Sequence, residues 1–419
     1  MNNSDLPLAV TNPEAARHLA LSTHYLFSQD FTRALHFTRL PVAAGDPAGA
    51  INRLTTLMLT RKFEAAAEFA TVALGGPVHH TTRHGVIETV TPALYFLGAR
   101  EGDCSDAYQL AYELAGDANL NPGMVRWQGQ ALQGKSLLLS LSRGGLGGYG
   151  DHIMWARFIP HVAALGARIV VQCPPLLERL FMTLPGVVST CGYEESPACD
   201  FATSMMELPW VLGMRGIPLK NPFNVGAVQF PEETHNVGIN WGASWAAPYM
   251  DRACALAEYL PLSQLPSVTL YGLQKGSHQK QLYPPPTGMK VHDLAPNLVD
   301  FLDTAVCLMS MDAVVTTDNV VGNLACMLGR PTFVLVPKCA DWRWGEGGRA
   351  PWYPSARVYQ QDEIGEWGAP IARLVHDLTR YLREQGRQLP KPVTMPESPV
   401  TFVRNTQPDV EAQPEEIQA

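Results

Sequence analysis

Two successive blocks of short apolar runs alternating with helix-like segments constrain the fold of this 419-residue chain more than any other feature. In the first block, an apolar run at 137–141 leads through a glycine-rich loop and a helix-like segment at 151–165 to a second apolar run at 168–172. A strand, a helix and a strand in that order form a βαβ unit, whose strands are parallel. A further helix is expected at 176–184, so the first block predicts one parallel α/β lobe.

The second block repeats this alternation. Strand-like runs lie at 238–241, 268–271, 313–316 and 332–336, and a helix is expected at 320–328 because Gly329 and Pro331 end it. Two such blocks predict two Rossmann-like lobes around a cleft, in which ligands bind at the carboxyl ends of the strands. We expect the first lobe to span 135–230 and the second to span 231–385.

The two ends of the chain differ from these blocks. Residues 1–130 read as helices, and similar stretches begin at Phe31 and Phe63, 32 residues apart, with a third at 106–114. A period in the thirties fits a tetratricopeptide-like solenoid, although ordinary helix packing also explains the pattern. Residues 386–419 are rich in Pro, Glu, Gln and Thr, which predicts a disordered tail.

Composition narrows the class of protein. The formal net charge of −8 and the lack of basic runs argue against a broad nucleic-acid-binding face. The eight cysteines are dispersed and never form C-x-x-C, so we expect reduced, buried thiols instead of a zinc site or a disulfide framework. Residues 1–10 lack the pattern of a secretory signal, and no apolar run approaches the ~18 residues of a spanning helix. These features predict a soluble, cytoplasmic protein.

A glycine-rich loop before Asp151 is the first candidate site. Its glycines are Gly144, Gly145, Gly147, Gly148 and Gly150. Glycines allow positive φ and close approach of a ligand, and a helix N-terminus favours anions. The spacing matches neither the dinucleotide fingerprint nor the phosphate loop, and a plain tight turn is the alternative. Asp151 either caps the following helix or accepts a proton from an attacking hydroxyl.

The second candidate site follows the strand at 313–316. Asp318 and Asn319 come at its carboxyl end, where Asp318 could bond sugar hydroxyls and the amides of the next helix could hold a diphosphate. Helix capping is the alternative for both residues. Gln274 and Lys275 follow the strand at 268–271 and bring a cation to the same edge, unless they form a solvated turn.

An aromatic loop and a histidine group remain. Trp342, Trp344 and Trp352 lie in one loop, where exposed aromatic area is unfavourable, so they either cover the cleft or pack the edge of the lobe. We expect them in the cleft. The other group is formed by His79, His80 and His84. These histidines have helical spacing but lie far from other candidate chemistry, so we interpret them as surface or packing residues and expect neither a metal nor a cofactor.

These motifs, taken together, resemble a known family. The resemblance rests on the glycine loop and its continuation to residue 187, and on the stretches 237–242, 273–276, 318–331 and 341–355. In order and spacing they resemble the GT-B part of bacterial tetratricopeptide-repeat proteins related to the ADP-heptose:lipopolysaccharide heptosyltransferases of glycosyltransferase family 9. The match covers about 135–385. It implies a GT-B fold and an inverting, metal-independent transferase, with the acceptor in the first lobe and a nucleotide-diphosphate sugar in the second.

The resemblance also implies roles for single residues. Asp151 matches the proposed catalytic base, and Asp318 matches the aspartate that binds the donor. The other residues expected on the donor side are Gln274 and Lys275 near the nucleotide, Arg252 near the phosphates, and Trp241, Asn319 and Asn323.

The chain departs from the family pattern at two places. Gly148, Tyr149 and Gly150 lengthen the loop before Asp151, and asparagine stands at 319 and 323 where the family has threonine and histidine. Asparagine can form hydrogen bonds but cannot carry the positive charge of an imidazolium. These departures bear on which donor fits the site and on activity.

The leading hypothesis is therefore a hexosyl- or heptosyl-type transferase. Its helical segment would bind a protein or recruit another macromolecular acceptor, such as a glycan or a modified nucleic-acid base. The main alternative is a non-catalytic helical-repeat scaffold with a degenerate GT-B module that binds a nucleotide or a partner. A sugar-nucleotide epimerase is a third hypothesis. The sequence leaves the sugar, the nucleotide base, the acceptor and the formation of a homo-oligomer open.

Overall fold

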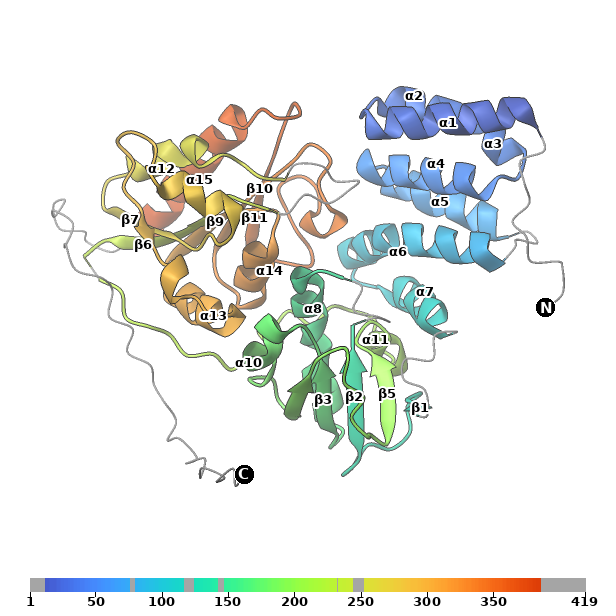
Figure 1. The fold of residues 1–419 in the computed structure, drawn as a ribbon, viewed down its shortest axis with the longest axis horizontal. Coiled ribbons are helices and arrows are strands. Elements are labelled where there is room, and N and C mark those ends of the chain that lie inside the picture. The colour runs from blue at the N-terminus through green and yellow to red at the C-terminus, as the bar shows by residue number, and fades with distance from the viewer. Residues whose placement is uncertain are drawn as a thin grey trace, which may run out of the picture.

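The computed structural model describes residues 12–75, 80–116, 124–141, 147–231, 233–243 and 252–385. Within these ranges, a stack of helices comes first and two parallel β-sheets follow it (Figure 1). The tail predicted at 386–419 lies outside the described residues. No described helix combines the length and the apolar character needed to cross a membrane.

The N-terminal part is helical, as predicted, and its helices stack in successive layers (Figure 1). The helices are α1 (Pro13–Phe27), α2 (Phe31–Phe37), α3 (Arg39–Ala43), α4 (Pro47–Leu59), α5 (Phe63–Leu74), α6 (His80–Glu101) and α7 (Ser105–Gly116). Asn12 and Asp46 cap α1 and α4, each followed by a proline at the first helical position. Ala34 and Ala66 are fully buried, so small side chains let neighbouring helices approach closely. A relation to tetratricopeptide repeats stays a prediction.

The first lobe contains a five-stranded sheet in which every pairing is parallel. Its strands, in the order β1-β5-β2-β3-β4, are β1 (Val125–Arg126), β5 (Phe201–Ser204), β2 (Ser136–Ser140), β3 (Arg168–Gln172) and β4 (Val187–Cys191). β1 falls within the range 1–130 that was expected to be helical. The sheet of the first lobe therefore begins before residue 135.

The helices of the first lobe are shorter than predicted. They are α8 (Tyr149–Trp155), α9 (Ile159–Ala163), α10 (Glu178–Phe181) and α11 (Leu208–Val211). A 3-10 turn, Ala156–Phe158, interrupts the helix expected at 151–165, and Pro160 lies in the first turn of α9, where its missing N–H is tolerated. Another 3-10 turn, Pro175–Leu177, replaces the start of the helix expected at 176–184.

The second lobe contains a six-stranded sheet, also parallel in every pairing. Its strands, in the order β11-β10-β9-β6-β7-β8, are β11 (Ala356–Gln360), β10 (Thr332–Val336), β9 (Ala313–Thr317), β6 (His235–Asn240), β7 (Val268–Gly272) and β8 (His292–Asp293). Its helices are α12 (Leu260–Ser263), α13 (Phe301–Met309), α14 (Val320–Met327) and α15 (Gly368–Glu384). The central strands are buried along their whole length, as in parallel sheets covered on both faces. The prediction of two parallel α/β lobes is confirmed.

A buried arginine joins the two lobes. Arg157 of the first lobe donates to the Trp352 carbonyl at 3.1 Å and to the Met327 Sδ at 2.9 Å. Its guanidinium also lies over the rings of Trp352 and Tyr353, at 5.1 and 5.4 Å from their centroids. Burial lowers the pKa of Arg157. Arg157 favours this one arrangement of the two lobes, because breaking its contacts would leave part of a buried, charged guanidinium without a partner.

Candidate functional site

A cleft of about 980 Å³ lies between the two lobes. It is lined by residues at or after the carboxyl ends of β2, β6, β7, β9 and β10, the edge at which parallel α/β sheets bind ligands. The predicted site residues that line it are Gly148, Gly150, Asp151, Arg252, Gln274, Lys275, Asp318, Asn319, Asn323 and Trp342.

The first turn of α8 places Asp151 in this cleft. Gly147 has a φ of 122°, which residues with a side chain rarely adopt, and the chain then enters α8. The Gly148 N–H donates to Asp151 Oδ2 at 2.8 Å, so this oxygen caps the helix. Gly144 and Gly145, also predicted for this loop, lie outside the described residues. Asp151 thus uses Oδ2 to cap the helix, and Oδ1 faces the second lobe.

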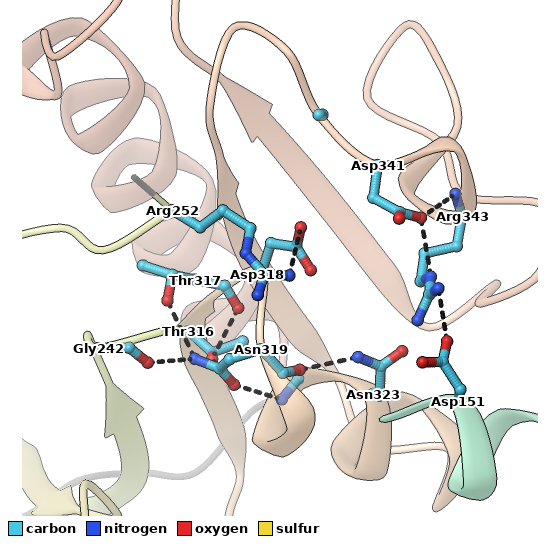
Figure 2. Close-up of polar contacts among 12 residues, drawn as sticks. Asp151, Gly242, Arg252, Thr316, Thr317, Asp318, Asn319, Asn323, Asp341 and Arg343 are labelled. Carbon is cyan, nitrogen blue, oxygen red and sulfur yellow. Dashed lines mark hydrogen bonds and ion pairs between the residues drawn. The ribbon is translucent and has the colours of Figure 1, made fainter. Parts of the chain in front are cut away.

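Arg343 of the second lobe binds that other oxygen (Figure 2). Its Nη2 lies 2.8 Å from Asp151 Oδ1, and its Nε lies 2.8 Å from Asp341 Oδ1. The backbone N–H of Arg343 donates to the same Asp341 oxygen at 3.0 Å. One cation therefore bridges two carboxylates, and Asp341 fixes the direction in which the guanidinium points.

The charges in this group depend on one another. Burial raises the pKa of Asp151, but the Arg343 cation and the Gly148 N–H outweigh it and leave the pKa below its ordinary value. Burial also raises the pKa of Asp341, and Arg343 offsets this only in part. Burial acts to lower the pKa of Arg343, yet the two carboxylates outweigh it and hold that pKa well above the ordinary range. Asp151 and Arg343 are therefore oppositely charged at neutral pH.

Asp318 forms a second ion pair in the cleft. It directly follows β9 and is 2% exposed. Arg252 Nη1 lies 3.5 Å from Asp318 Oδ2. Figure 2 shows this ion pair as a dashed line between the two side chains. A buried carboxylate requires such a partner. The structure thus brings together two residues that were predicted for the donor side.

Asn319 holds the start of α14 against the end of β6. Its Oδ1 accepts from the Gly322 N–H at 3.1 Å, which caps α14. Its Nδ2 donates to Asn240 Oδ1 at 2.6 Å. The same Nδ2 donates to the Gly242 carbonyl at 3.1 Å, a contact that Figure 2 draws. These bonds favour the capping interpretation of Asn319, since its side-chain amide is engaged within the protein.

Asn323 lies in α14 and packs against α8. Tyr353 donates to its Oδ1 at 2.7 Å, and its Nδ2 donates to the Asn319 carbonyl at 2.9 Å. The residue is 3% exposed. A Cβ added at Gly150 would lie only 2.9 Å from Asn323 Nδ2, so glycine is needed for this close approach of the two helices. The geometry gives Asn323 a structural role, and because the residue also lines the cleft, its donor-binding role stays a prediction.

Gln274 and Lys275 differ in how they meet the cleft. Gln274 Oε1 accepts from the N–H groups of Gly242 at 2.6 Å and Trp241 at 3.2 Å, so its amide shapes the backbone after β6. Lys275 is exposed, and its ammonium donates to the Leu298 carbonyl. Of the two, Lys275 is the one that offers charge to a ligand.

The tryptophans divide into one cleft residue and three core residues. Trp342 lines the cleft, and the ring of Tyr95 in α6 stacks on it with centroids 5.5 Å apart. Trp241, Trp344 and Trp352 are buried in the core, at most 1% exposed, and do not line the cleft. The predicted donor role of Trp241 and the predicted cleft roles of Trp344 and Trp352 are wrong. The sequence predicts that tryptophans in a loop must be covered. It does not show which part of the protein covers them, which here is α6 and the core of the lobe.

Among the cleft residues to which the sequence prediction gives no role are the polar residues Asp341, Arg343 and Asn240. Asp341 and Arg343 follow β10, a strand inside the sheet, at the edge where ligands bind. Their place after a buried strand, as Asp-x-Arg, is a signal that the sequence contains. Asn240 is the last residue of β6 and carries no comparable signal.

Metal and disulfide sites are not found in the part of the chain that the structure describes. Within it, no three His, Cys, Asp or Glu side chains come together as metal ligands. His79 lies outside this part, and α6 begins at His80. The eight cysteines, all among the described residues, form no disulfide with one another, and seven of them are buried. The burial of these seven thiols agrees with the expectation, and their reduced state stays a prediction.

Comparisons with known proteins give distant similarities. No protein-family model matches the chain. Protein FlbA of Caulobacter vibrioides is 25% identical over 296 residues, which are 62% of this chain, and the chain spans about half (49%) of that protein's length.

Among solved structures, the family 9 glycosyl transferase of Veillonella parvula matches 62% of this chain over its whole length, with 10% identity and a TM-score of 0.47. The E. coli ADP-heptose lipopolysaccharide heptosyltransferase II matches 60% of this chain over 99% of its own. That match has 16% identity and a TM-score of 0.40.

Proposed function

We propose that the chain is a glycosyltransferase that moves a hexosyl or heptosyl unit from a nucleoside-diphosphate sugar to an acceptor hydroxyl. One observation carries this proposal. Asp151 of the first lobe lies in the same cleft as Arg252 and Arg343, two cations of the second lobe. Sugar transfer needs a base for the acceptor hydroxyl and positive charge for the leaving diphosphate, and these residues supply both.

In the proposed reaction, Asp151 takes the proton of the acceptor hydroxyl while the hydroxyl oxygen attacks the anomeric carbon. The bond from that carbon to the diphosphate breaks, and the diphosphate leaves with the electron pair. Attack from the opposite face inverts the anomeric centre. Arg343, Arg252 and Lys275 stabilise the leaving charge, so the proposed transfer is metal-independent. General-base assistance contributes a factor of ~10²–10⁴ to such a step.

The second lobe would hold the donor. The N–H groups at the start of α14 form a positive helix terminus at the carboxyl end of β9, where a diphosphate is favoured. Asp318 lines the same edge and would bond the sugar hydroxyls. The helical segment would present a macromolecular acceptor, because Tyr95 of α6 packs directly on Trp342 in the cleft wall.

The proposal is tested by a thermal-shift screen with ADP, GDP, UDP, CDP and dTDP and with their hexose conjugates. A ligand that binds only the folded protein stabilises it by about 2.7 kcal/mol at a hundredfold excess over Kd. We expect one nucleotide family to raise Tm in the wild type and to lose this effect in Asp318→Asn. Asp362→Asn is the matched control, because Asp362 is an exposed carboxylate of the same lobe, paired with Arg373.

Slow hydrolysis of the donor that stabilises the protein, and its loss in Asp151→Asn with binding retained, would then support the catalytic role of Asp151. The non-catalytic scaffold predicts binding with no hydrolysis and no transfer. If no nucleotide raises Tm at millimolar concentration, the proposed function is wrong.

A further inference from the structure

The ion pair between Asp151 and Arg343 raises a conflict with the proposed chemistry. A general base must be free to take a proton, yet the cation binds Asp151 Oδ1 at 2.8 Å and holds its pKa down. The Gly148 N–H occupies Oδ2. In this arrangement both oxygens of Asp151 already accept hydrogen bonds, and the carboxylate is a weak base.

Arg343 is built to change partners at one end only. Its Nε and its backbone N–H both bind Asp341, and its guanidinium lies 5.6 Å from the ring of Trp342, on which Tyr95 stacks. These contacts fix Arg343 from its backbone to its Nε and leave the Nη end able to change partner. A guanidinium has five N–H donors, and those at the Nη end bind planar anions such as phosphate well.

We infer that Arg343 is a catalytic residue with two successive partners. It binds Asp151 in the donor-free site and then binds the diphosphate of the donor, which frees Asp151 to act as the base. This inference rests on the proposed function and adds an order of events to it: a bound donor switches the base on.

The energetic reason follows from the contacts. Once Arg343 turns to the diphosphate, the burial that raises the pKa of Asp151 is no longer opposed by that cation, and the Gly148 N–H and the nearby His152 are the groups that still lower it. Asp151 then becomes a stronger base at the moment when the donor is in place. The same movement puts Arg343 against the charge that develops on the leaving group. Without a donor, the paired Asp151 does not activate water or an acceptor.

Competition for Arg343 gives a sharp test, a double-mutant cycle on anion binding. Calorimetry would measure the Kd of inorganic pyrophosphate, ADP, GDP, UDP, CDP and dTDP for the full-length wild type, Asp151→Asn, Arg343→Gln and the double variant. Asp151→Asn keeps an acceptor oxygen for the Gly148 N–H and is expected to bind the anion about tenfold more tightly, because the competitor is removed. Arg343→Gln is expected to bind it at least tenfold more weakly.

The decisive value is the effect of Asp151→Asn in the Arg343→Gln background. The inference predicts no tightening there, since no cation remains to be released. Equal tightening in both backgrounds would mean that Asp151 only repels the anion, and this result overturns the inference while leaving nucleotide binding intact. A protein that binds none of the probes refutes both the proposed function and the inference.

Two control variants separate the effect of Arg343 from a loss of stability and from a change in net charge. Arg343→Lys keeps a cation beside Asp341 and is expected to retain part of the coupling, so it serves if Arg343→Gln lowers Tm. Arg373→Gln removes an exposed arginine of the same lobe, paired with Asp362, and should leave each Kd unchanged. A changed Kd in Arg373→Gln would assign the effect to net charge and would also overturn the inference.

Discussion

Replacing Gly150 with alanine tests whether the contact between α8 and α14 sets the width of the cleft. A Cβ at this position would lie 2.9 Å from Asn323 Nδ2, 3.2 Å from its Cγ and 3.7 Å from its Cβ. The first two distances are too short for comfortable packing. Asn323 cannot swing away without losing its bonds to Tyr353 and to the Asn319 carbonyl. The two helices must therefore separate or Asn323 must give up its partners.

The magnitude follows from opposing terms. Alanine gains up to ~1 kcal/mol over glycine in a helix, whereas overpacking costs about 1–3 kcal/mol, so we expect a net loss of about 1 kcal/mol in the free energy of unfolding. Asn323→Ala alone removes two hydrogen bonds and leaves the Tyr353 hydroxyl buried without that partner, a loss of about 2 kcal/mol. In the double variant the new Cβ at 150 meets the Cβ at 323 at an ordinary contact distance of 3.7 Å, so the two losses do not add.

Guanidinium unfolding, monitored by tryptophan fluorescence, measures the unfolding free energies of the double-mutant cycle. Donor hydrolysis reports whether the geometry of the cleft has changed. We expect a coupling energy of about 1–3 kcal/mol between the two sites and a larger effect of Gly150→Ala on hydrolysis than on stability, because the helix carrying Asp151 moves. Gly368→Ala is the control, since Gly368 also lies in the first turn of a helix and its added Cβ meets nothing within 4 Å. Additivity within ~0.5 kcal/mol would refute the reasoning.

Two further predictions concern other parts of the chain. Arg126→Met leaves the fully buried carboxylate of Glu207 without its cation at 2.6 Å and is expected to cost about 3 kcal/mol of unfolding free energy in denaturant titrations; a loss below ~1 kcal/mol would show that the pair is dispensable. Burial raises the pKa of Cys173, Cys307 and Cys326 to about 12, so at pH 8 these thiols are neutral and should react with iodoacetamide far more slowly in the native than in the unfolded protein. Fast native labelling of these sites, located by mass spectrometry, would contradict this expectation.

The strands that could be predicted are those buried on both faces. β3 and β10 have the predicted bounds because a strand covered by helices on both sides is a continuous apolar run. β5, Phe201–Ser204, is mostly polar or small and was not predicted, since its pairing with β2 and β1 is long-range and leaves no local pattern. The broken helices of the first lobe follow from Pro160 and Pro175, whose effect on helix length a periodicity alone does not measure.

The candidate site shows the same division. The positions of Asp151 and Asp318 at one cleft follow from the rule that parallel sheets bind ligands at their carboxyl ends. The partner of Asp151 does not follow from it, because Arg343 lies 192 residues further along the chain and pairs only when the lobes meet. For Asn323, the sequence shows a polar residue near the start of a helix. Its role depends on how closely α8 approaches α14, which the sequence does not show.

The aromatic cluster where the three parts of the chain meet has a consequence for synthesis on the ribosome. Tyr95, Trp155, Trp342 and Trp352 contact one another through their rings, but about 190 residues separate Trp155 from Trp342. At ~5–20 residues per second, the ribosome delivers the second pair roughly 10 to 40 seconds after the first. During that interval the helical segment and the first lobe present uncovered aromatic surface in the cell. Growth temperature and chaperone supply should therefore govern the yield of folded protein more strongly than they govern the stability of the finished chain.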